Sequence, residues 1–316
     1  MIELKALSKT FGEQTAVKGI SLTVETGQFC TLIGTSGCGK STTLKMINRL
    51  IEPSAGKVLI NKQDVSTMPA ESLRRRIGYA IQGVGLFPHR NVFDNIATVP
   101  VLLGWDKASI IQRVKELLEL FHLDYERFST KFPHQLSGGE QQRVGVARAL
   151  AAKPEVLLMD EPFGALDPLT RESLQDEILS IQKILAITTI MVTHDIDEAI
   201  KMADVIAVMD KGTLLQFDTP QSLLRNPKPG FVSNIVGGLD RSLRLLTLNQ
   251  VADVMNGSPA PNNGTAKPSI PLNTNLRDAV SMHIWEGEDT LAVSDETGAI
   301  VGTVSLNDIL SKGAKS

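Results

Sequence analysis

GTSGCGKS, at residues 34–41, is the stretch on which the fold of this chain depends. It has the spacing G-x-x-x-x-G-K-[ST], in which glycines let backbone N–H groups approach an anion and a lysine reaches the β- and γ-phosphates of a nucleotide. The apolar run 29–33 predicts a buried strand entering the loop, and residues 42–50 predict the helix leaving it. A helix that begins at Lys40 would direct unpaired N–H groups and a positive dipole end at the same anion. The alternative is a glycine- and serine-rich turn that happens to contain a lysine, and the flanking strand and helix favour the phosphate loop.

Length and composition limit the class of protein. The chain has 316 residues, 42% of them apolar, which is enough for about two domains with sizeable cores. A net charge of −3 argues against binding nucleic acid through bulk positive charge. No apolar run approaches the roughly 18 residues that span a bilayer, and the start of the chain lacks the pattern of a secretory signal. Two cysteines provide no disulfide framework and suit a reducing cytoplasm.

Polar residues follow three apolar runs that are predicted to be buried strands. Gln82, His194 and the pair Asp160-Glu161 each come directly after such a run. Because the carboxyl ends of parallel strands meet at one edge of a sheet, where α/β proteins place their ligands, we expect these side chains to converge. Strand alternation predicts that the two carboxylates point in different directions, so that one can serve a metal while the other faces a water. Taken alone, two solvated acids and a structural histidine would be the ordinary interpretation.

The middle of the chain carries a second anion-binding pattern. Residues 92–150 are predicted to be helical, since apolar side chains recur there at helix spacing. Within them, Ser137-Gly138-Gly139 precedes a helix and offers backbone N–H groups and a hydroxyl. The preceding loop 83–89 is rich in glycine and apolar side chains, which predicts that it docks on another surface. The basic run 74–76 is interpreted as a solvated face.

Two residues beside the phosphate loop have both a functional and a passive interpretation. Cys38 lies near the predicted helix N-terminus, which would lower the pKa of its thiol, or it only fills the loop. Phe11 is an isolated aromatic residue upstream of the loop. Its ring either stacks on a nucleotide base or packs in the core or at an edge, and its position alone does not decide between these.

Composition changes after about residue 236. Residues 256–264 are rich in Asn, Gly, Ser and Pro and read as a linker. Residues 277–310 are compact again, with a predicted helix, two strands around a turn, and the start of a last helix. From residue 241 onward there are six basic and eight acidic residues, a balance that does not favour attraction to anionic lipid.

These ordered motifs resemble the nucleotide-binding subunit of ATP-binding cassette (ABC) transporters over residues 1–235. The resemblance rests on the phosphate loop, on Gln82, on LSGGE at residues 136–140, on VLLMDE at 156–161 and on His194. The amino-acid sequences of residues 34–50 and 77–89 are most similar to those of ATPases from osmoprotectant importers. The resemblance implies an α/β fold: a P-loop NTPase (RecA-like) core with an antiparallel β subdomain and a helical subdomain at about 90–150. A small C-terminal α+β module similar to cystathionine-β-synthase (CBS) domains would follow.

The resemblance also implies domain limits and site residues. An ABC ATPase domain would span residues 1–236, a linker 237–275 and a CBS-like regulatory module 276–316. The implied catalytic residues are Glu161 as general base, His194, Gln82 and Lys40, and the implied ligands of Mg²⁺ are Ser41, Gln82 and Asp160. The implied ATP-binding residues are Phe11, Gly34, Thr35, Ser36, Gly37, Cys38, Gly39, Lys40, Ser41, Thr42, Gln82, Asp160 and His194, with Ser137, Gly138, Gly139 and Asp167 acting on the nucleotide of a facing copy.

Partners and location follow from the same resemblance. It implies a head-to-tail dimer with two ATP molecules between the copies, integral membrane permease subunits and, indirectly, an extracytoplasmic solute-binding protein, but no nucleic acid. The subunit would lie on the cytoplasmic face of the inner membrane as a peripheral protein. A soluble cassette ATPase for DNA repair or translation, and an exporter, are the alternatives. The C-terminal module could dimerise, sense ionic strength or a membrane, or bind an adenine nucleotide. The sequence of this subunit does not identify the transported solute, because the cassette does not contact it.

Overall fold

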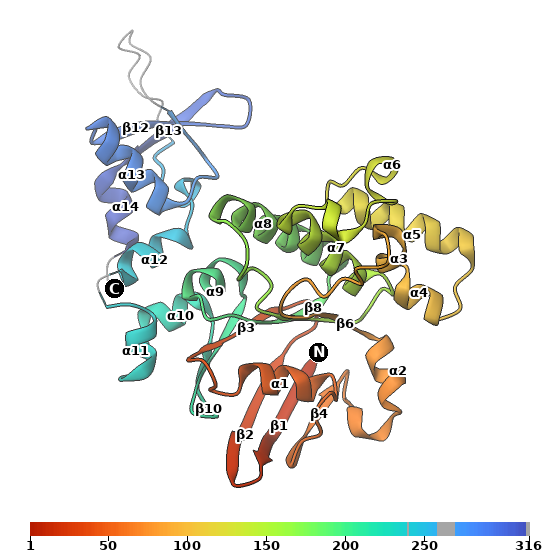
Figure 1. Cartoon of the computed structure of the whole chain (residues 1–316). Coiled ribbons are helices and arrows are strands. Elements are labelled where there is room, and N and C mark those ends of the chain that lie inside the picture. The colour runs from red at the N-terminus through yellow and green to blue at the C-terminus, as the bar shows by residue number, and fades with distance from the viewer. Residues whose placement is uncertain (239, 258–268, 314–316) are drawn as a thin grey trace. The chain divides into compact units, whose positions relative to one another are not determined.

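The computed structural model describes residues 1–238, 240–257 and 269–313 (Figure 1). The chain folds as two compact units, Met1–Asp218 and Thr219–Ser316. The division lies earlier than the predicted domain boundary after residue 236, because helix α10 (Pro220–Arg225) packs against α12 (Arg241–Thr247) within the second unit. Within the described residues, no helix has the length and the apolar content that a membrane span requires.

The first unit holds two sheets. One has the strand order β2-β1-β4-β5, and the other has the order β10-β9-β3-β8-β7-β6. Neighbours in the larger sheet run parallel except β10, which pairs with β9 in the antiparallel sense. The strands are β1 Ile2–Phe11, β2 Gln14–Val24, β3 Phe29–Gly34, β4 Ala55–Ile60, β5 Gln63–Asp64, β6 Ile77–Ala80, β7 Val156–Asp160, β8 Thr188–Val192, β9 Val205–Asp210 and β10 Thr213–Asp218.

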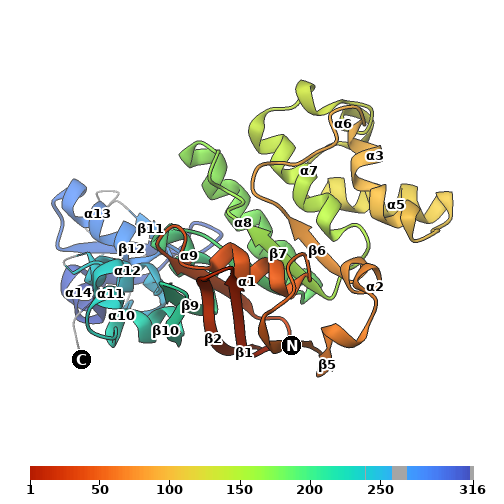
Figure 2. The ribbon, with the colours of Figure 1, turned by 60° about the horizontal axis from the view of Figure 1, so that its bottom comes forward.

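Helices α7 and α8 lie on one side of the larger sheet and α1 lies on the other (Figures 1 and 2). The predicted helical segment 92–150 is the run from α3 to α7. The helices of the unit are α1 Lys40–Ile47, α2 Ala70–Arg75, α3 Val92–Ile96, α4 Thr98–Leu102, α5 Lys107–Leu120, α6 Tyr125–Phe128, α7 Gly138–Leu150, α8 Pro168–Leu185 and α9 Ile196–Met202, with short 3₁₀ turns at Val65–Thr67 and Pro133–Gln135.

Alternation along the central strands divides the core into two layers. In β7, Leu157 and Met159 pack with α5, α7 and α8, whereas Val156 and Leu158 pack with α1 and the smaller sheet. All five residues of β7 are buried, as expected of a strand in the middle of a parallel sheet with both faces covered. The apolar runs of the sequence therefore build a sheet whose carboxyl edge is left for polar side chains.

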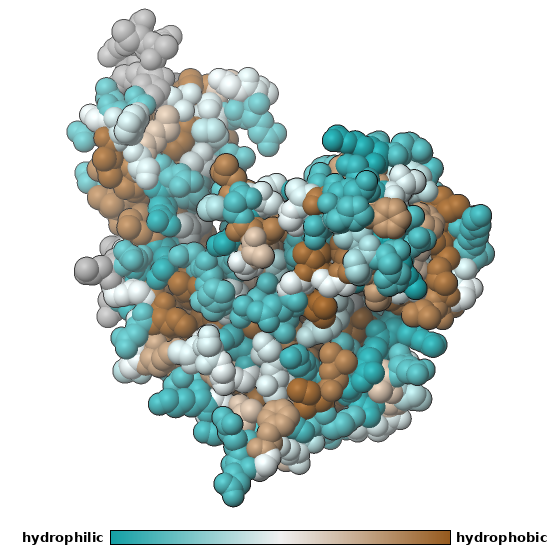
Figure 3. All heavy atoms as spheres, viewed as in Figure 1, coloured by the Kyte–Doolittle hydropathy of each residue, from teal (hydrophilic) through white to brown (hydrophobic). Residues whose placement is uncertain are grey.

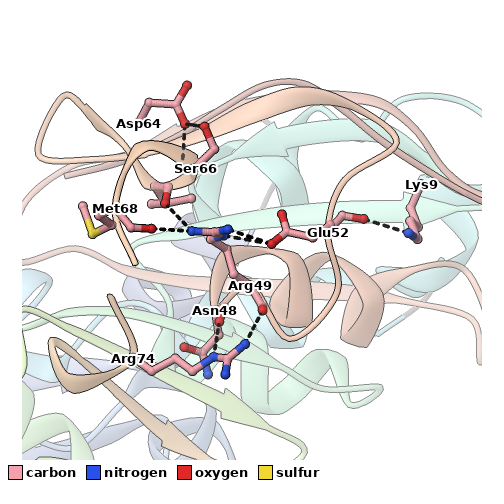
Figure 4. Close-up of polar contacts among 9 residues, drawn as sticks. Lys9, Asn48, Arg49, Glu52, Asp64, Ser66, Met68 and Arg74 are labelled. Carbon is pink, nitrogen blue, oxygen red and sulfur yellow. Dashed lines mark hydrogen bonds and ion pairs between the residues drawn. The ribbon is translucent and has the colours of Figure 1, made fainter. Parts of the chain in front are cut away.

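Helix α1 ends earlier than predicted. The sequence predicted a helix through residue 50, but α1 stops at Ile47 and Arg49 has a φ of +47°. The Arg49 guanidinium donates to the carbonyl oxygen of Met68 at 2.7 Å and to Glu52 Oε1 at 2.8 Å (Figure 4). These contacts with residues outside the helix hold the chain in the left-handed turn.

The basic run 74–76 lies at the surface, as predicted, with Arg74 and Arg75 exposed and Arg76 partly exposed. Arg74 donates to the carbonyl oxygens of Asn48 and Arg49, which lie beyond the end of α1 (Figure 4). Arg76 pairs with Glu155 at 2.7 Å. Arg75 lies 4.0 Å from Glu71, so each of the three guanidinium groups has a carbonyl or carboxylate partner at this surface.

The second unit is built on a three-stranded sheet of order β11-β12-β13, with β11 parallel to β12 and β12 antiparallel to β13. Its buried apolar cluster joins the sheet to the helices α12, α13 and α14. Besides α10 and α12, its elements are α11 Phe231–Ile235, a 3₁₀ turn at Val251–Asp253, β11 Ser269–Pro271, α13 Leu276–Glu286, β12 Thr290–Ser294, β13 Ile300–Ser305 and α14 Leu306–Gly313.

The structure differs from the predicted linker at 237–275. Leu246, Val251 and Ile270 from that range are buried in the core of the second unit. Their apolar side chains pack with α13 and the sheet, so much of the range belongs to a folded body. Residues 258–268, which include most of the predicted linker stretch 256–264, lie outside the described residues.

Candidate functional site: a phosphate loop and three strand ends

Two glycines of the phosphate loop, Gly34 and Gly39, lie where a side chain would collide with neighbouring backbone atoms. Gly34 has a φ of +153°, and a Cβ there would lie 2.0 Å from the carbonyl oxygen of Met209. Gly39, which caps α1, has a φ of +105°, and a Cβ there would lie 2.6 Å from the carbonyl oxygen of Ala16. The strand–loop–helix context predicted around residues 34–41 is present, with β3 entering and α1 beginning at Lys40.

Lys40 is buried in the loop and its ammonium group is held there. Its Nζ donates to the carbonyl oxygens of Gly34 at 2.8 Å and Thr35 at 3.0 Å. Cys38 is also buried, and burial raises the pKa of its thiol, with Lys40 acting in the opposite direction. Of the two interpretations of Cys38, passive filling of the loop therefore fits the structure, and a lowered pKa does not.

A hydroxyl and a carboxylate meet at the start of α1. Ser41 Oγ donates to Asp160 Oδ1 at 2.9 Å, which joins the loop to the end of β7. Asp160 is only 4% exposed. Burial raises the pKa of the nearby Tyr79 to about 12, and the charge of Asp160 adds to that effect. The site thus contains a buried carboxylate beside a hydroxyl, both of them hard oxygen ligands.

The oxygen atoms of Ser41 and Asp160 can provide part of a Mg²⁺ coordination shell. Among the described residues, no group of three or more His, Cys, Asp or Glu side chains is placed to hold a metal ion. A Mg²⁺ ion bound through Ser41 and Asp160 would therefore need phosphate oxygens or waters to complete its shell. That is the usual mode of Mg²⁺ in nucleotide sites, where the ion keeps several waters and uses few carboxylates.

Glu161 is the centre of the predicted cluster at the sheet edge. Its Oε2 lies 3.4 Å from Gln82 Nε2 and 3.5 Å from His194 Nδ1. The three residues follow β6, β7 and β8, which are parallel neighbours, so the expected convergence is present. Glu161 itself has left the strand, with a φ of +47°. The Glu161 and Asp160 carboxylates therefore point in different directions because of this left-handed turn. Strand alternation, the reason given in the prediction, does not apply.

The second anion-binding pattern forms two neighbouring helix N-termini. Ser137 caps α7, where its Oγ accepts from the Glu140 N–H and Glu140 Oε2 accepts from the Ser137 N–H. Asp167 caps α8 by accepting from the Thr170 N–H, and hydrogen bonding from the Thr170 side chain, and then from its backbone, lowers the pKa of the Asp167 carboxyl. A Cβ at Gly139 would lie 2.4 Å from Thr170 Cγ2, so the two helix starts are in contact.

Within the described residues of one copy, this pair of helix starts has no hydrogen-bonded link to the phosphate loop. In the described part of the chain, no hydrogen bond joins Ser137, Gly138, Gly139 or Asp167 to residues 34–41.

Phe11 and the remaining loop residues complete the predicted set. Phe11 ends β1 and is 49% exposed, which excludes the core interpretation. The Lys9 ammonium lies 5.0 Å from its ring centroid. Ser36 and Gly37 are exposed in the loop, and Thr42 is half-buried in α1.

Two residues of the site were missed from the sequence. Asp210 Oδ1 lies 3.4 Å from Thr35 Oγ1, and Tyr79 lies beside Asp160. Asp210 ends β9, so the rule that singled out Gln82 and His194 applied to it as well. Tyr79 carried no such signal, because it lies inside a strand and its neighbour comes from another one.

Known proteins share this arrangement of motifs. A family described as ABC transporter matches residues 17–164. The glycine betaine uptake system ATP-binding protein of Escherichia coli K12 is 46% identical over 98% of this chain and 99% of its own length. The carnitine transport ATP-binding protein of Listeria monocytogenes is 46% identical over 98% of this chain and 76% of its own. The osmoprotectant import ATP-binding protein of Salmonella typhimurium is 49% identical over 86% of this chain and 72% of its own.

Solved structures agree with the fold. The dimeric structure of an ATP-binding cassette in a post-hydrolysis state, bound to ADP and Pi, has a TM-score of 0.63 and 32% identity, covering 70% of this chain and 99% of that one. A protein of Clostridium perfringens that is part of an ABC transporter complex has a TM-score of 0.66 and 28% identity, covering 71% of this chain and 90% of that one.

Proposed function

This chain belongs to the family of ABC transporter ATP-binding proteins and is an ATPase, and we propose that it powers solute uptake through separate membrane subunits. The proposed solute is a compatible solute such as glycine betaine, choline or carnitine. The observation that carries this proposal is similarity over almost the whole chain to proteins named for the uptake of such solutes. An importer ATPase for another small polar solute is the alternative.

The phosphate loop is proposed to bind ATP with its backbone N–H groups and with Lys40. The Lys40 ammonium already lies inside the loop on two carbonyl oxygens, so a phosphate oxygen can replace them without a large movement of the side chain. Ser41, Gln82 and Asp160 would hold Mg²⁺, which offsets the charge of the β- and γ-phosphates when it is bound. Phe11 would stack on the base, since its ring is accessible at the end of β1.

Glu161 is proposed as the general base for the attacking water. Its carboxylate is partly accessible, and it is oriented by a hydrogen bond from the Gln82 amide and by the His194 imidazole 3.5 Å away. His194, with a side chain that is 62% exposed, is free to contact the γ-phosphate. Positioning and charge stabilisation carry most of a phosphoryl transfer, so this small cluster is sufficient for the chain's part of the reaction.

Ser137, Gly138, Gly139 and Asp167 are proposed to act on the ATP of a second copy. They form an N–H-rich surface that has no bond to its own phosphate loop in the described residues. A two-fold dimer with two nucleotides between the copies gives each loop the missing half of its site. Dimeric cassettes among the solved relatives support this arrangement.

A pocket beside the loop 83–89 is proposed to receive a permease subunit. It has a volume of about 450 Å³, and Ile81, Phe87 and the arginines 74, 75 and 148 are part of its lining. Asn48 also lines it, and in the described part of the chain its buried Oδ1 has no hydrogen-bond partner. Apolar side chains gather beside the pocket over α4, where Val101 and Leu102 are exposed (Figure 3). An apolar segment with an acidic group and one free donor would satisfy these side chains.

The second unit is proposed to be a CBS-like module that promotes dimerisation. Its order of strand, helix, two strands and helix from β11 to α14 supports this assignment. Sensing of ionic strength and binding of an adenine nucleotide remain the competing roles. Removal of the residues after Asp218 should weaken dimerisation while ATP hydrolysis at high protein concentration persists. A truncated subunit that loses only the osmotic response of transport would overturn the dimerisation role.

Uptake measurements test the transport proposal. The subunit would lie on the cytoplasmic face of the inner membrane, contacting its permease there and an extracytoplasmic solute-binding protein only indirectly. Cells with and without this chain would be given labelled glycine betaine, choline and carnitine, and uptake of at least one should depend on the chain. Co-purification of an integral membrane protein supports transport, whereas co-purification of ribosomes or nucleic acid would refute it.

A further inference from the structure

The loop after β6 connects the proposed water-activating cluster with helix α7. Its second residue is Gln82, whose Nε2 lies 3.4 Å from Glu161 Oε2. Gly83 and Gly85 follow with φ angles of +72° and +55°, a backbone conformation that residues with a side chain rarely adopt. The loop therefore turns sharply twice within four residues, and its course depends on what holds the glycine segment in place.

Helix α7 supplies that support at two positions on one face. At Gly145 the helix has no side chain, and a Cβ there would lie 3.3 Å from the carbonyl oxygen of Val84. Three residues later, Arg148 Nη1 donates to the carbonyl oxygen of Gly85 at 2.7 Å. The spacing i, i+3 puts both positions on the same side of the helix. We name the Gly145 surface and the Arg148 guanidinium together the loop seat.

The Arg148 guanidinium of the loop seat is partly buried. Burial lowers the pKa of Arg148, so its charge is held against a desolvation cost that its contact with Gly85 offsets. The same guanidinium lies 5.6 Å from the ring centroid of Phe87 further along the loop. Phe87 is in turn bound through its N–H to the fully buried Asn95. The loop is thus fastened to the helical segment, while Gln82 extends from it toward Glu161.

The far end of α7 carries the other proposed half-site. Ser137 caps the helix, and the Arg143 guanidinium is joined to Glu177 of α8 by bonds of 2.7 and 2.6 Å. A helix of 13 residues is about 20 Å long and stiff, so Ser137 and the loop seat move as one body. Any displacement of Ser137 relative to the sheet is then transmitted to Val84 and Gly85.

We propose that Arg148 is a positioning residue for ATP hydrolysis, which holds the loop so that Gln82 reaches Glu161 only when α7, and with it Ser137, is in place. The proposal rests on the proposed roles of Gln82 and Ser137. It predicts that Arg148 acts on turnover through the loop, without touching the nucleotide. Its substitution should change kcat and leave the affinity for ATP unchanged.

Arg148→Met keeps the length of the side chain and removes its donors. We expect kcat for ATP to fall about tenfold, a loss typical of a misplaced positioning group, while KM stays within about twofold. Arg148→Lys, which keeps the charge and one donor, should recover part of the rate. ATP binding by the monomer, followed with a fluorescent ATP analogue, should not change.

Arg113→Met is the matched control. Arg113 also donates to backbone carbonyls at this end of α7, those of Leu150 at 2.9 Å and Ala151 at 3.3 Å, and it pairs with Glu116 at 3.2 Å. Among the described residues, no hydrogen bond joins Arg113 to the loop. Thermal unfolding should show comparable destabilisation in both variants, with kcat per folded molecule lowered only in Arg148→Met. Equal loss of kcat in the two variants would reduce Arg148 to a structural residue and overturn the proposal.

A double-mutant cycle with Gln82→Ala separates the possible failures. If Arg148 acts through the loop, Arg148→Met in the Gln82→Ala background should lower kcat little further, whereas independent effects would multiply. Full multiplication overturns the proposal and leaves the role of Gln82 intact. If Gln82→Ala alone hydrolyses ATP at the parent rate, the proposed role of Gln82 is wrong, and the inference falls with it.

Discussion

Two groups of polar residues in the first unit differ in what they can do alone. At the sheet edge, Glu161 lies within 3.5 Å of both Gln82 and His194, so a base and two orienting groups meet at one point. At the start of α7, Ser137 and two glycines present helix-terminal N–H groups and a hydroxyl that caps its own helix. The first group can activate water, while the second can only bind an anion. The difference fits the proposal that a complete site needs both and that the second comes from another copy.

Glu161→Gln tests the first group and has the largest expected effect. Loss of the base should lower hydrolysis by about 10²–10⁴-fold while ATP still binds, so that a closed dimer accumulates. Phosphate release and size-exclusion chromatography with ATP measure the two effects. Glu155→Gln is the control, because that carboxylate pairs with Arg76 at the surface. Turnover of Glu161→Gln at the parent rate would show that another group is the base.

Ser137→Arg tests the second group. It should lower hydrolysis by about 10²-fold or more by blocking the helix terminus, and leave nucleotide binding to the isolated monomer intact. Mixing Ser137→Arg with Glu161→Gln subunits gives a sharper result. If the groups act across the dimer, one composite site carries both changes and the other carries neither, so activity returns. Two inactive sites in the mixture would mean that Ser137 and Glu161 of one copy act on the same nucleotide, which would contradict action across the dimer.

Arg143→Met tests what holds the second group to α8. The Arg143–Glu177 pair has side chains only 17% and 11% exposed, and removing one partner leaves the other charge buried. We expect a loss of about 2–3 kcal/mol in the free energy of unfolding, measured in urea. Arg76→Met, which breaks the exposed Arg76–Glu155 pair, should cost less than about 1 kcal/mol. Equal losses would mean that the α7–α8 pair contributes no more than a surface ion pair.

Phe11→Ala has the smallest expected effect and lies outside both groups. Stacking of a base on an aromatic ring contributes about 1–3 kcal/mol, so the affinity for ATP should fall by about tenfold with little change in kcat. Phe11→Trp keeps a π face and should keep the affinity. Isothermal titration with ATP and with triphosphate alone distinguishes the contribution of the base. A Phe11→Ala variant that binds ATP as the parent does would assign the ring to the edge of β1 alone.

Local patterns in the sequence were sufficient for most of the first unit. Apolar runs predicted the parallel strands, and the rule that ligands lie at their carboxyl ends predicted the meeting of Gln82, Glu161 and His194. Predictions from local sequence patterns were wrong where contacts with residues outside the segment determine the structure. The turn at Arg49 ends α1 because Met68 and Glu52 bind its guanidinium. The predicted linker is largely folded because α12 and Val251 find a core in residues that follow much later.

The sequence by itself determined which residue types meet the phosphate and which strands carry them, because glycine conformation, helix period and strand alternation act between near neighbours. Only the tertiary structure decided that Glu161 turns out of its strand, that Ser137 and Asp167 start neighbouring helices, and that Arg148 holds the loop of Gln82. Each of these depends on atoms from distant parts of the chain, such as the Gly85 carbonyl 63 residues before Arg148. The geometry of such contacts is set when the elements pack, and no local period in the sequence records it.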